Sequence, residues 1–455
     1  MSRTPTVLLV GHDSEAGQHW AWRWADSDGW GPLHRLHRGG ACEVRALLAS
    51  AIPGLARRDS AGPVESLGWL AHPHTEATLA TRLGRLLLPP ALRKEVIARA
   101  QHFGGPVRFR VHPSPSTSTV PWEALAIDDG PDAALRLIEV ADVVQVAPLL
   151  RRDLGLDPVH HLDGTSGALL VVDPKLSDEG VGRVLTTTAR DAWRRELMAQ
   201  ESTLAAGSVF GERYDRRLLS RHLPGRSRFV FVGHVTAEPD DPWRTGLALS
   251  CHPKLYATGP ANGLRHRSLT ALDLIRGTRG IEAALADRTA FRTRFGRDDV
   301  DEHTVPARAW DPSARRVLEV DGADLWPMPP RVGIVGCRSG PDLAHPEPSG
   351  LVTAVLRAGA EIVIATRWTL YTARTYRDHL QHGMVEDPLA EAARAVDRSL
   401  ASPAPEKALG AWQRDQLTAW RKTGVLASSP LTWGALSLTD GGRRRLEPAP
   451  AATIW

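Results

Sequence analysis

A cysteine and a histidine occur in closely similar settings in this 455-residue sequence. Cys337 ends the stretch RVGIVGC and His234 ends RFVFVGH, so each follows a short apolar run and a glycine. Short apolar runs bounded by turn residues are typical of buried β-strands. A histidine that takes the proton of a cysteine turns the thiol into a nucleophile. The pattern indicates a cysteine–histidine dyad at the ends of two neighbouring parallel strands.

Each of these residues also has an ordinary structural interpretation. A lone cysteine at a strand end acts as a small hydrophobic residue, and a lone histidine there is usually a satisfied polar group. His12, at the end of TVLLVGH, stands in almost the same setting as His234, so the local pattern does not choose between them. The glycines before the dyad, Gly233 and Gly336, favour a catalytic role because they leave room for a substrate backbone.

The composition is that of a soluble globular protein. At 455 residues and 42% hydrophobic, the chain can form two to three domains, or one large core with an appendage. No apolar run approaches the roughly 18 residues of a membrane span, and the N-terminal TVLLV is too short for a signal-peptide core. We therefore expect a cytoplasmic protein. The three cysteines, Cys42, Cys251 and Cys337, are too sparse for a disulfide framework, so free thiols are expected.

Several classes of partner and cofactor are disfavoured. The net charge of +4 comes from basic residues interspersed with 52 acidic ones, which indicates a solvated surface, and nucleic-acid binding is not expected. The sequence lacks a G-x-x-x-x-G-K-[ST] phosphate loop and a G-x-G-x-x-G motif after a strand. Its histidine pairs, at 72 and 74 and at 160 and 161, have no partners at metal-ligand spacing. We expect neither a cofactor nor a metal.

Strand-like and helix-like segments alternate along the chain. The strand-like segments are TVLLVGH, VRFRVHP, LIEVADVVQVAP, ALLVVDP, RFVFVGH, RVGIVGC, EIVIATRW and LTWGALSLTDGG. Helical spacing is found in PALRKEVIARAQHF, TTTARDAWRRELMAQ and SGLVTAVLRAGA. The alternation predicts an α/β fold with a mainly parallel sheet flanked by helices. In such a sheet, reactive groups gather outside the carboxyl ends of the strands, where Cys337 and His234 fall.

The sequence divides into three predicted parts. Residues 1–78 form a β-rich extension, in which the alternating Trp20, Trp22 and Trp24 predict a hairpin packed on its tryptophan face. Residues 79–441 form the main domain, and residues 442–455 form an extended tail.

A polar, proline-punctuated stretch at about 281–329 is predicted to be an insertion between core strands of the main domain. It either covers the crevice as a lid or forms an inert surface loop.

Several blocks resemble the CHAT-domain family, which is related to caspases and separases. In the family's order, over roughly residues 79–441, they are LGRLLLPPALRKEVI, VPWEALAI, ALLVVDP, RFVFVGHVTAEPDDPWRTGLALS, LTALDL, RVGIVGCRSG, SGLVTAVLRAGAEIVIATRW and SSPLTWGALSLTDG. The resemblance implies a caspase-like sheet and a cysteine endopeptidase, with His234 as base and Cys337 as nucleophile. His12 falls outside it and is either structural or part of a degenerate caspase-like half.

Two features depart from the family's pattern. The oxyanion donors are expected to be the backbone N–H groups of Val235 and Cys337, but the family usually has glycine directly after its histidine. Valine resists a positive φ, so the loop needs an ordinary backbone conformation or the oxyanion hole is incomplete. The histidine also precedes the cysteine by about twice the roughly 50 residues found in caspases, which the predicted insertion explains.

Four acidic residues near strand ends are candidates for a pocket that reads the residue before the scissile bond: Asp173, Glu238, Asp240 and Asp241. Acidic residues at loop ends are also commonly just solvated. The alternative to a peptidase is a catalytically inactive caspase-like scaffold or binding module, for which Val235 is the best argument.

As a peptidase, the protein is expected to cleave a protein substrate and to stay latent until a regulatory or sensor protein activates it. Relatives often carry repeat or sensor domains, whereas this chain has no repeat of 20–50 residues. The resemblance also implies a role in bacterial defence or signalling.

Overall fold

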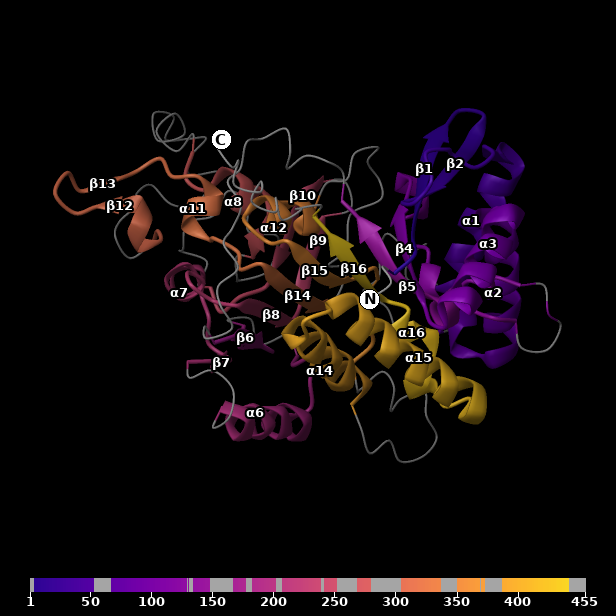
Figure 1. Ribbon diagram of the computed structural model, residues 1–455. Helices are drawn as coiled ribbons and strands as arrows, with labels where there is room; N and C mark the ends of the chain where they lie inside the picture. The colour runs from indigo at the N-terminus through magenta and orange to yellow at the C-terminus, as the bar shows by residue number, and fades with distance from the viewer. Residues whose placement is uncertain are drawn as a thin grey trace, which may run out of the picture.

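The computed structural model describes thirteen segments of the chain: residues 4–52, 67–128, 130, 134–147, 167–176, 182–201, 207–238, 241–251, 268–279, 304–336, 350–368, 370–372 and 387–441. Within these residues, eleven strands form one sheet (Figure 1). In order across the sheet, they are β3 (His34–His37), β2 (Gly17–Trp24), β1 (Thr6–Ser14), β4 (Val107–His112), β5 (Ala141–Val146), β16 (Leu436–Asp440), β15 (Ile362–Thr366), β14 (Arg331–Gly336), β8 (Arg228–Gly233), β6 (Leu169–Val172) and β7 (Val209–Gly211).

Most neighbouring strands of this sheet are parallel. Strand β2 is antiparallel to β1 and to β3, and β15 is antiparallel to β16. Two smaller antiparallel sheets consist of β9 (Val235–Glu238), β10 (Asp241–Leu247) and β11 (Leu269–Thr270), and of β12 (Trp310–Asp311) and β13 (Arg316–Val317).

The α-helices of the described residues are α1 (Arg38–Ala51), α2 (Pro73–Leu87), α3 (Pro90–Phe103), α4 (Leu137–Val140), α6 (Thr187–Glu201), α7 (Arg216–His222), α8 (Ala271–Arg276), α11 (Gly322–Leu325), α12 (Leu351–Arg357), α14 (Pro388–Ala401), α15 (Pro405–Thr423) and α16 (Pro430–Trp433). Short 3₁₀ helices are η2 (Trp69–Ala71), η3 (Pro115–Thr117), η4 (Trp122–Ala124), η5 (Ala307–Ala309) and η6 (Leu426–Ser428). None of these helices is both long enough and apolar enough to cross a membrane.

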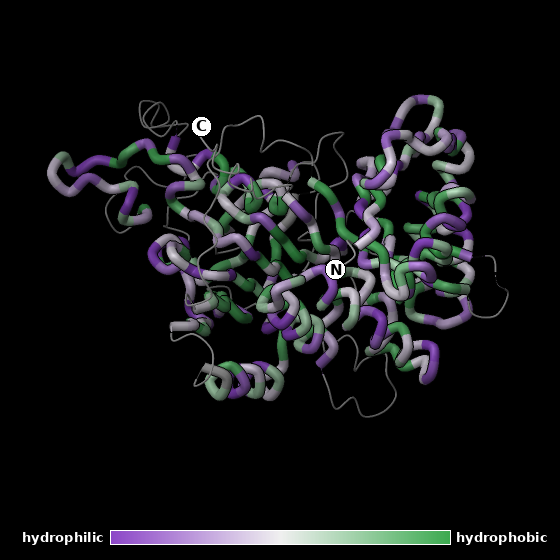
Figure 2. Tube along the Cα trace, viewed as in Figure 1, coloured by the Kyte–Doolittle hydropathy of each residue, from purple (hydrophilic) through white to green (hydrophobic). Residues whose placement is uncertain are grey.

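Helices cover both faces of the central strands. On β8, Phe229 and Phe231 belong to the core cluster that contains α8 and α12, whereas Val230 and Val232 belong to the cluster that contains α14. Successive side chains of a strand point to opposite faces, and burial of both faces explains the continuous apolar run of β8. Figure 2 shows hydrophobic residues along the strands and hydrophilic ones on the outer turns of the helices. The predicted α/β fold with a mainly parallel sheet flanked by helices is confirmed.

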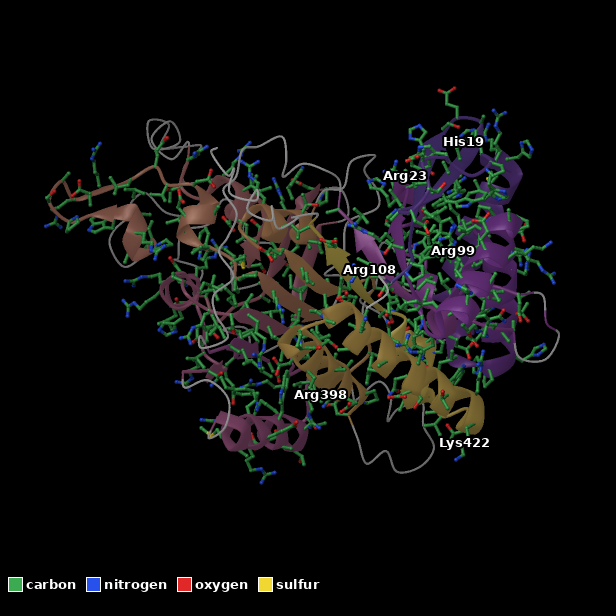
Figure 3. All side chains as sticks on the ribbon, viewed as in Figure 1. His19, Arg23, Arg99, Arg108, Arg398 and Lys422 are labelled. Carbon is green, nitrogen blue, oxygen red and sulfur yellow. The ribbon has the colours of Figure 1, made fainter. Side chains whose placement is uncertain are left out.

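The N-terminal residues join this sheet. The tryptophans of β2 are buried in one core cluster, and β2 forms an antiparallel pair with β3. Strand β1 pairs in parallel with β4, and the predicted boundary between residues 78 and 79 falls within α2. Figure 3 shows Arg108 of β4 near the C-terminal helices, where its guanidinium forms an ion pair with Glu406 of α15. The division of the chain at residue 78 stays a prediction.

Two predicted strand segments are partly helical. In LIEVADVVQVAP, the first four residues form α4 and only the following ones form β5. In LTWGALSLTDGG, α16 ends at Trp433 and β16 begins at Leu436. Helix α16 starts at Pro430, and proline fits the first turn of a helix because it needs no hydrogen-bonded N–H there.

The later part of the predicted insertion at 281–329 contributes to the core. Leu325 and Trp326 are buried, and the indole Nε1 of Trp326 donates a hydrogen bond to the carbonyl of Arg216, at 3.0 Å. Its described residues begin at 304 and include the β12–β13 hairpin. Residues 281–303, like the predicted tail at 442–455, lie outside the described residues.

Candidate functional site

Strands β8 and β14 are direct neighbours in the sheet, run parallel and end together. Their register pairs Gly233 with Gly336, the last residue of each strand. His234 follows Gly233 in the sequence and Cys337 follows Gly336. Cys337 itself lies outside the described residues, so the structure gives the positions of the two strand ends and of the histidine.

The glycine at the end of β14 is required by close packing. A Cβ atom at Gly336 would lie 2.3 Å from the carbonyl oxygen of Gly233, closer than any side chain tolerates. The carbonyl of Gly336 accepts a hydrogen bond from the hydroxyl of Thr366, at the end of β15, over 2.8 Å. The two neighbouring strands, β8 and β15, thus hold this end of β14 in a defined position.

His234 is half-buried, and its ring is held from one side. The distance from Nε2 to the carbonyl oxygen of Gly182 is 2.7 Å. A carbonyl oxygen can only accept a hydrogen bond, so Nε2 carries the proton and donates it. In the neutral ring, Nδ1 is then the acceptor nitrogen, which is the one able to take a proton from another group.

Val235 begins β9 and has an ordinary extended backbone. Among the described residues, Asp173 and Arg315 are the non-glycine residues with positive φ, so Val235 avoids the conformation that valine resists. Val235 lies opposite Leu247 in the β9–β10 pair, and the His234 carbonyl accepts from the Ala248 N–H at 3.0 Å. Bonded and non-bonded pairs alternate in an antiparallel ladder, so the Val235 N–H points away from β10.

Asp173 follows β6 and is only 1% exposed. Its Oδ1 accepts a hydrogen bond from the backbone N–H of Val184, at 3.0 Å. Burial raises the pKa of this carboxyl, although the Val184 N–H and the Arg183 guanidinium act in the opposite direction. Its carboxylate is therefore engaged inside the protein, and its predicted role in a substrate pocket stays a prediction.

The other three predicted pocket residues belong to the β9–β10 hairpin. Glu238 pairs with Asp241, the side chain of Glu238 is not among those described, and Asp240 lies outside the described residues. The Asp241 carboxylate forms an ion pair with Arg244, at 3.0 Å, with both side chains about 40% exposed. The hairpin starts directly after His234, and Glu238 and Asp241 are paired at its other end, four residues along β9 from the histidine.

His12 lies in a different part of the sheet. Its strand, β1, is separated from β14 by β4, β5, β16 and β15. Neighbouring strands are about 4.8 Å apart, so β1 and β14 are separated by about 24 Å. His12 pairs with His19 of β2 instead. Strand order thus distinguishes two histidines that the local sequence pattern did not.

The other two cysteines are in contrasting environments. Cys251 is completely buried, and burial raises the pKa of its thiol to about 11. Cys42 is exposed, and its sulfur lies 3.1 Å from the Nη2 of Arg45. In the described part of the chain, no group of three or more histidine, cysteine, aspartate or glutamate side chains could hold a metal ion.

Sequence reasoning could not identify the groups that hold this site. Gly182 contributes a backbone carbonyl, which every residue type possesses, so no sequence pattern marks it. Thr366 ends an apolar strand, which is a common place for a threonine and marks no special role. Only the fold brings its hydroxyl to the carbonyl of Gly336.

No protein-family model and no curated protein matches this sequence. Among solved structures, the chain is similar to the Saccharomyces cerevisiae separase–securin complex, with 10% identity and a TM-score of 0.47 over 96% of this chain. It spans about 30% of the separase chain. It is also similar to the Arg-specific cysteine proteinase gingipain R, with 8% identity and a TM-score of 0.38 over 78% of this chain and 68% of that one. Both TM-scores are below 0.5, so neither likeness establishes a family or an activity.

Proposed function

We propose that this protein is a cysteine endopeptidase of the CHAT caspase-like type, with a dyad formed by Cys337 and His234. One observation carries the proposal: β8 and β14 are parallel neighbours whose final glycines are paired in register. Residues that leave two such strands from paired positions start about 4.8 Å apart, within reach of a histidine–cysteine contact.

In the proposed reaction, Nδ1 of His234 takes the proton of the Cys337 thiol, and the thiolate attacks a peptide carbonyl carbon. The tetrahedral intermediate carries its negative charge on the former carbonyl oxygen, which the N–H groups of Val235 and Cys337 stabilise. The protonated imidazole then gives its proton to the leaving amine as the C–N bond breaks. Water, deprotonated by the same nitrogen, hydrolyses the thioester and restores the thiol.

The hydrogen bond to Gly182 supports this assignment of roles. It leaves Nδ1 as the basic nitrogen, and it stabilises the imidazolium formed during the reaction because Nε2 keeps its acceptor. The Val235 N–H points away from β10 and is therefore not used in the β9–β10 ladder, which supports its role as an oxyanion donor. Glu238, Asp240 and Asp241 are proposed to read the residue before the scissile bond.

The proposed substrate is a protein, and the proposed location is the cytoplasm. We expect the isolated chain to cleave peptides weakly and a regulatory protein to raise that activity. Vigorous cleavage by the isolated chain would exclude latency while leaving the peptidase assignment intact.

A catalytically inactive scaffold is the competing function, and the valine after His234 favours it. Val235 is only 7% exposed, so its side chain packs into the core. A glycine at this position would have no side chain and would leave the backbone open. A scaffold would keep the caspase-like sheet and bind a partner without cleaving it.

Cleavage of a peptide library distinguishes the two functions. It is measured for the wild type and for the variants Cys337→Ser, His234→Ala and Cys42→Ser. A peptidase loses all cleavage in Cys337→Ser, loses about 10²–10⁴-fold in His234→Ala, and is unchanged in Cys42→Ser. Cleavage that survives Cys337→Ser contradicts the proposed nucleophile. No cleavage by the wild type, alone or with a regulatory protein that binds it, favours the scaffold.

A further inference from the structure

We propose that Asp173 is a positioning residue, whose buried carboxylate holds the segment 182–185 so that the Gly182 carbonyl fixes the orientation and tautomer of His234. This inference rests on the proposed function, and it gives Asp173, first predicted to lie in a substrate pocket, a role that acts through the backbone of the segment 182–185.

Asp173 is fixed to the sheet beside β8. Its own N–H donates to the carbonyl of Val232, at 2.6 Å, two residues before His234 in the sequence. Its side chain then turns to the segment 182–185 and accepts the Val184 N–H at 3.0 Å. Asp173 therefore joins the strand that ends at the histidine to the segment that contacts the histidine ring.

The link from that segment to the ring is short. Gly182, whose carbonyl accepts from Nε2 of His234, lies two residues before Val184. A displacement of Val184 would move this carbonyl, and a misplacement of about 1 Å can cost a catalytic group about 100-fold in rate. The carboxylate thus acts on the histidine through the backbone.

A second contact braces the same segment. The guanidinium of Arg183 donates to the carbonyl oxygen of Asp173 and forms an ion pair with Glu212, at 3.2 Å. Asp173 therefore holds the segment twice: its carbonyl accepts from the side chain of Arg183, and its carboxylate accepts from the backbone N–H of Val184.

Two unfavourable features of Asp173 call for a compensating role. Its φ is +50°, a left-handed conformation that aspartate and asparagine tolerate better than most residues. Its Oδ2 is buried and has no hydrogen bond of ordinary geometry within the described residues, although the backbone N–H of Leu185 acts on the carboxyl and lowers its pKa, and the Arg183 nitrogen is 3.9 Å away. Strained backbones and incompletely paired buried groups gather at functional sites, because function is what retains them.

The test uses two replacements of Asp173 and one matched control in the full-length protein. Asp173→Gly removes the acceptor but tolerates φ of +50°, and Asp173→Asn keeps both an acceptor oxygen and the left-handed conformation. The control is Asp321→Gly, because Oδ1 of Asp321 likewise accepts a backbone N–H, from Ala323 at 3.0 Å.

The first readout is the ¹⁵N spectrum of the His234 ring, which distinguishes the two neutral tautomers and needs no activity. The wild type and Asp173→Asn should show the proton on Nε2. Asp173→Gly should show a mixture of tautomers, and Asp321→Gly should match the wild type. The second readout is peptide cleavage, in which Asp173→Gly should lower kcat by about 100-fold with little change in KM, and Asp173→Asn should restore it.

An unchanged His234 spectrum in Asp173→Gly overturns the proposal, as does an equal change in Asp321→Gly, which would indicate a general loss of stability. If Asp173→Gly does not fold, Asp173→Asn and the wild type remain: a proton on Nδ1 of the wild-type ring at neutral pH contradicts the hydrogen bond to Gly182, and a wild-type spectrum is required of Asp173→Asn. Failure of the proposed function is seen separately, as wild-type protein that cleaves nothing while its ring spectrum behaves as expected.

Discussion

Glu123 and Arg367 form a buried ion pair that joins η4, in the connection between β4 and β5, to the end of β15. The guanidinium donates to both carboxylate oxygens, at 2.7 and 2.8 Å, and the two side chains are 0% and 2% exposed. Arg367 follows Thr366, the residue whose hydroxyl holds the end of β14. This pair fixes the strand that supports the candidate site.

We expect Glu123→Ala to lower the free energy of unfolding by about 3–5 kcal/mol, because it leaves a buried guanidinium without its counter-charge. Glu43 is the control: its ion pair with Arg82 is exposed, so Glu43→Ala should change the free energy by less than about 1 kcal/mol. Urea denaturation measures both. Similar losses from the two variants would show that the buried pair has no special importance.

His112, the last residue of β4, makes the stability of the fold depend on pH. Burial lowers the pKa of its ring below the usual 6.5, because the charged form is disfavoured inside the protein. As the pH falls below 6.5, the unfolded chain binds a proton that the folded chain does not, so stability is lost. The stability is therefore unreduced by His112 above pH 6.5, and it declines as the pH falls from there through the lowered pKa of the folded protein.

The expected result is a smaller loss of stability on acidification in His112→Gln than in the wild type, measured as urea midpoints at about pH 8 and about pH 5.5. His102→Gln, at an exposed position of α3, should keep the wild-type dependence. Equal pH dependence in His112→Gln and the wild type would exclude this histidine as a source.

At the scale of residues, the sequence identified side chains but not their partners. The settings of His234 and Cys337 were visible because a strand, a glycine and a reactive residue form a local pattern. The burial of Asp173 and its bond to Val184 were not visible, because both depend on how β6 and the segment after it fold against β8.

At the scale of elements, the close approach of β8 and β14 depends on Gly336. A methyl group there would meet the Gly233 carbonyl at 2.3 Å, and backbone atoms cannot yield as a flexible side chain can. The strands would have to separate where the candidate dyad begins.

Gly336→Ala should therefore lower the free energy of unfolding by about 1–3 kcal/mol and reduce the reactivity of Cys337. Gly39→Ala is the matched control, because a methyl group at this position of α1 meets nothing within 4 Å and should stabilise the helix by about 0.5–1 kcal/mol. Chemical denaturation compares the two. If Gly336→Ala is as stable as the wild type, the strand ends are not as closely packed as described.

Most elements of the sheet could be predicted, but not its order. Runs such as RFVFVG and RVGIVG indicate strands buried on both faces, and those strands form as predicted. The place of β16, parallel to β5 and antiparallel to β15, has no local signal, because it depends on where the chain returns after α15. Helix α16 was missed because LTWG has the apolar character of a strand. The proline before it, Pro430, fits the first turn of a helix and was not taken into account.

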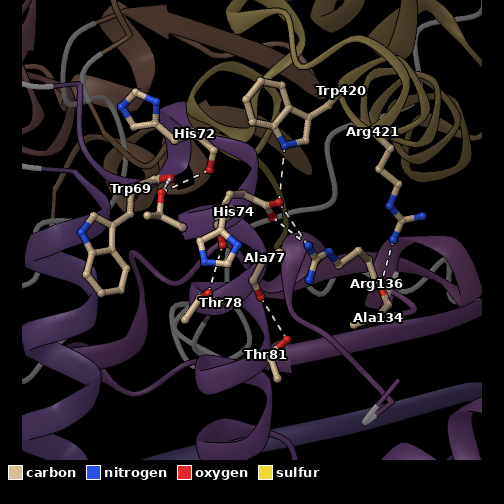
Figure 4. Close-up of polar contacts among 12 residues, drawn as sticks. Trp69, His72, His74, Ala77, Thr78, Thr81, Ala134, Arg136, Trp420 and Arg421 are labelled. Carbon is tan, nitrogen blue, oxygen red and sulfur yellow. Dashed lines mark hydrogen bonds and ion pairs between the residues drawn. The ribbon is translucent and has the colours of Figure 1, made fainter. Parts of the chain in front are cut away.

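At the scale of the whole molecule, the N-terminal and C-terminal parts hold each other. Glu76 of α2 forms a buried ion pair with Arg136, at 3.1 Å, and accepts a hydrogen bond from the indole of Trp420 in α15, at 3.4 Å (Figure 4). Strand β1 covers the edge of β4. The sequence suggested that the N-terminal part is an appendage. Its contacts with the rest of the chain could not be predicted, because they join residues far apart in the sequence.

A chain that begins at residue 79 should aggregate or lose cooperative unfolding. It would start inside α2, lack Glu76 and expose the edge of β4, and unpaired edges promote association. Deletion of residues 442–455, the predicted tail, is the control and should leave the thermal midpoint unchanged. A soluble truncated chain with the wild-type midpoint would instead support an independent domain from residue 79.

The most direct test of the central claim is a timed reaction with iodoacetamide near neutral pH, with mass mapping of each cysteine in the wild type, His234→Ala and His12→Ala. The dyad predicts that Cys337 reacts fastest, because an adjacent imidazole favours its thiolate. Cys251 should react slowest, since it is buried with a raised pKa, and Cys42 should react as an ordinary exposed thiol. His234→Ala should slow Cys337 strongly, and His12→Ala should not. A Cys337 that reacts no faster than Cys42, or that is indifferent to His234, would contradict the claim.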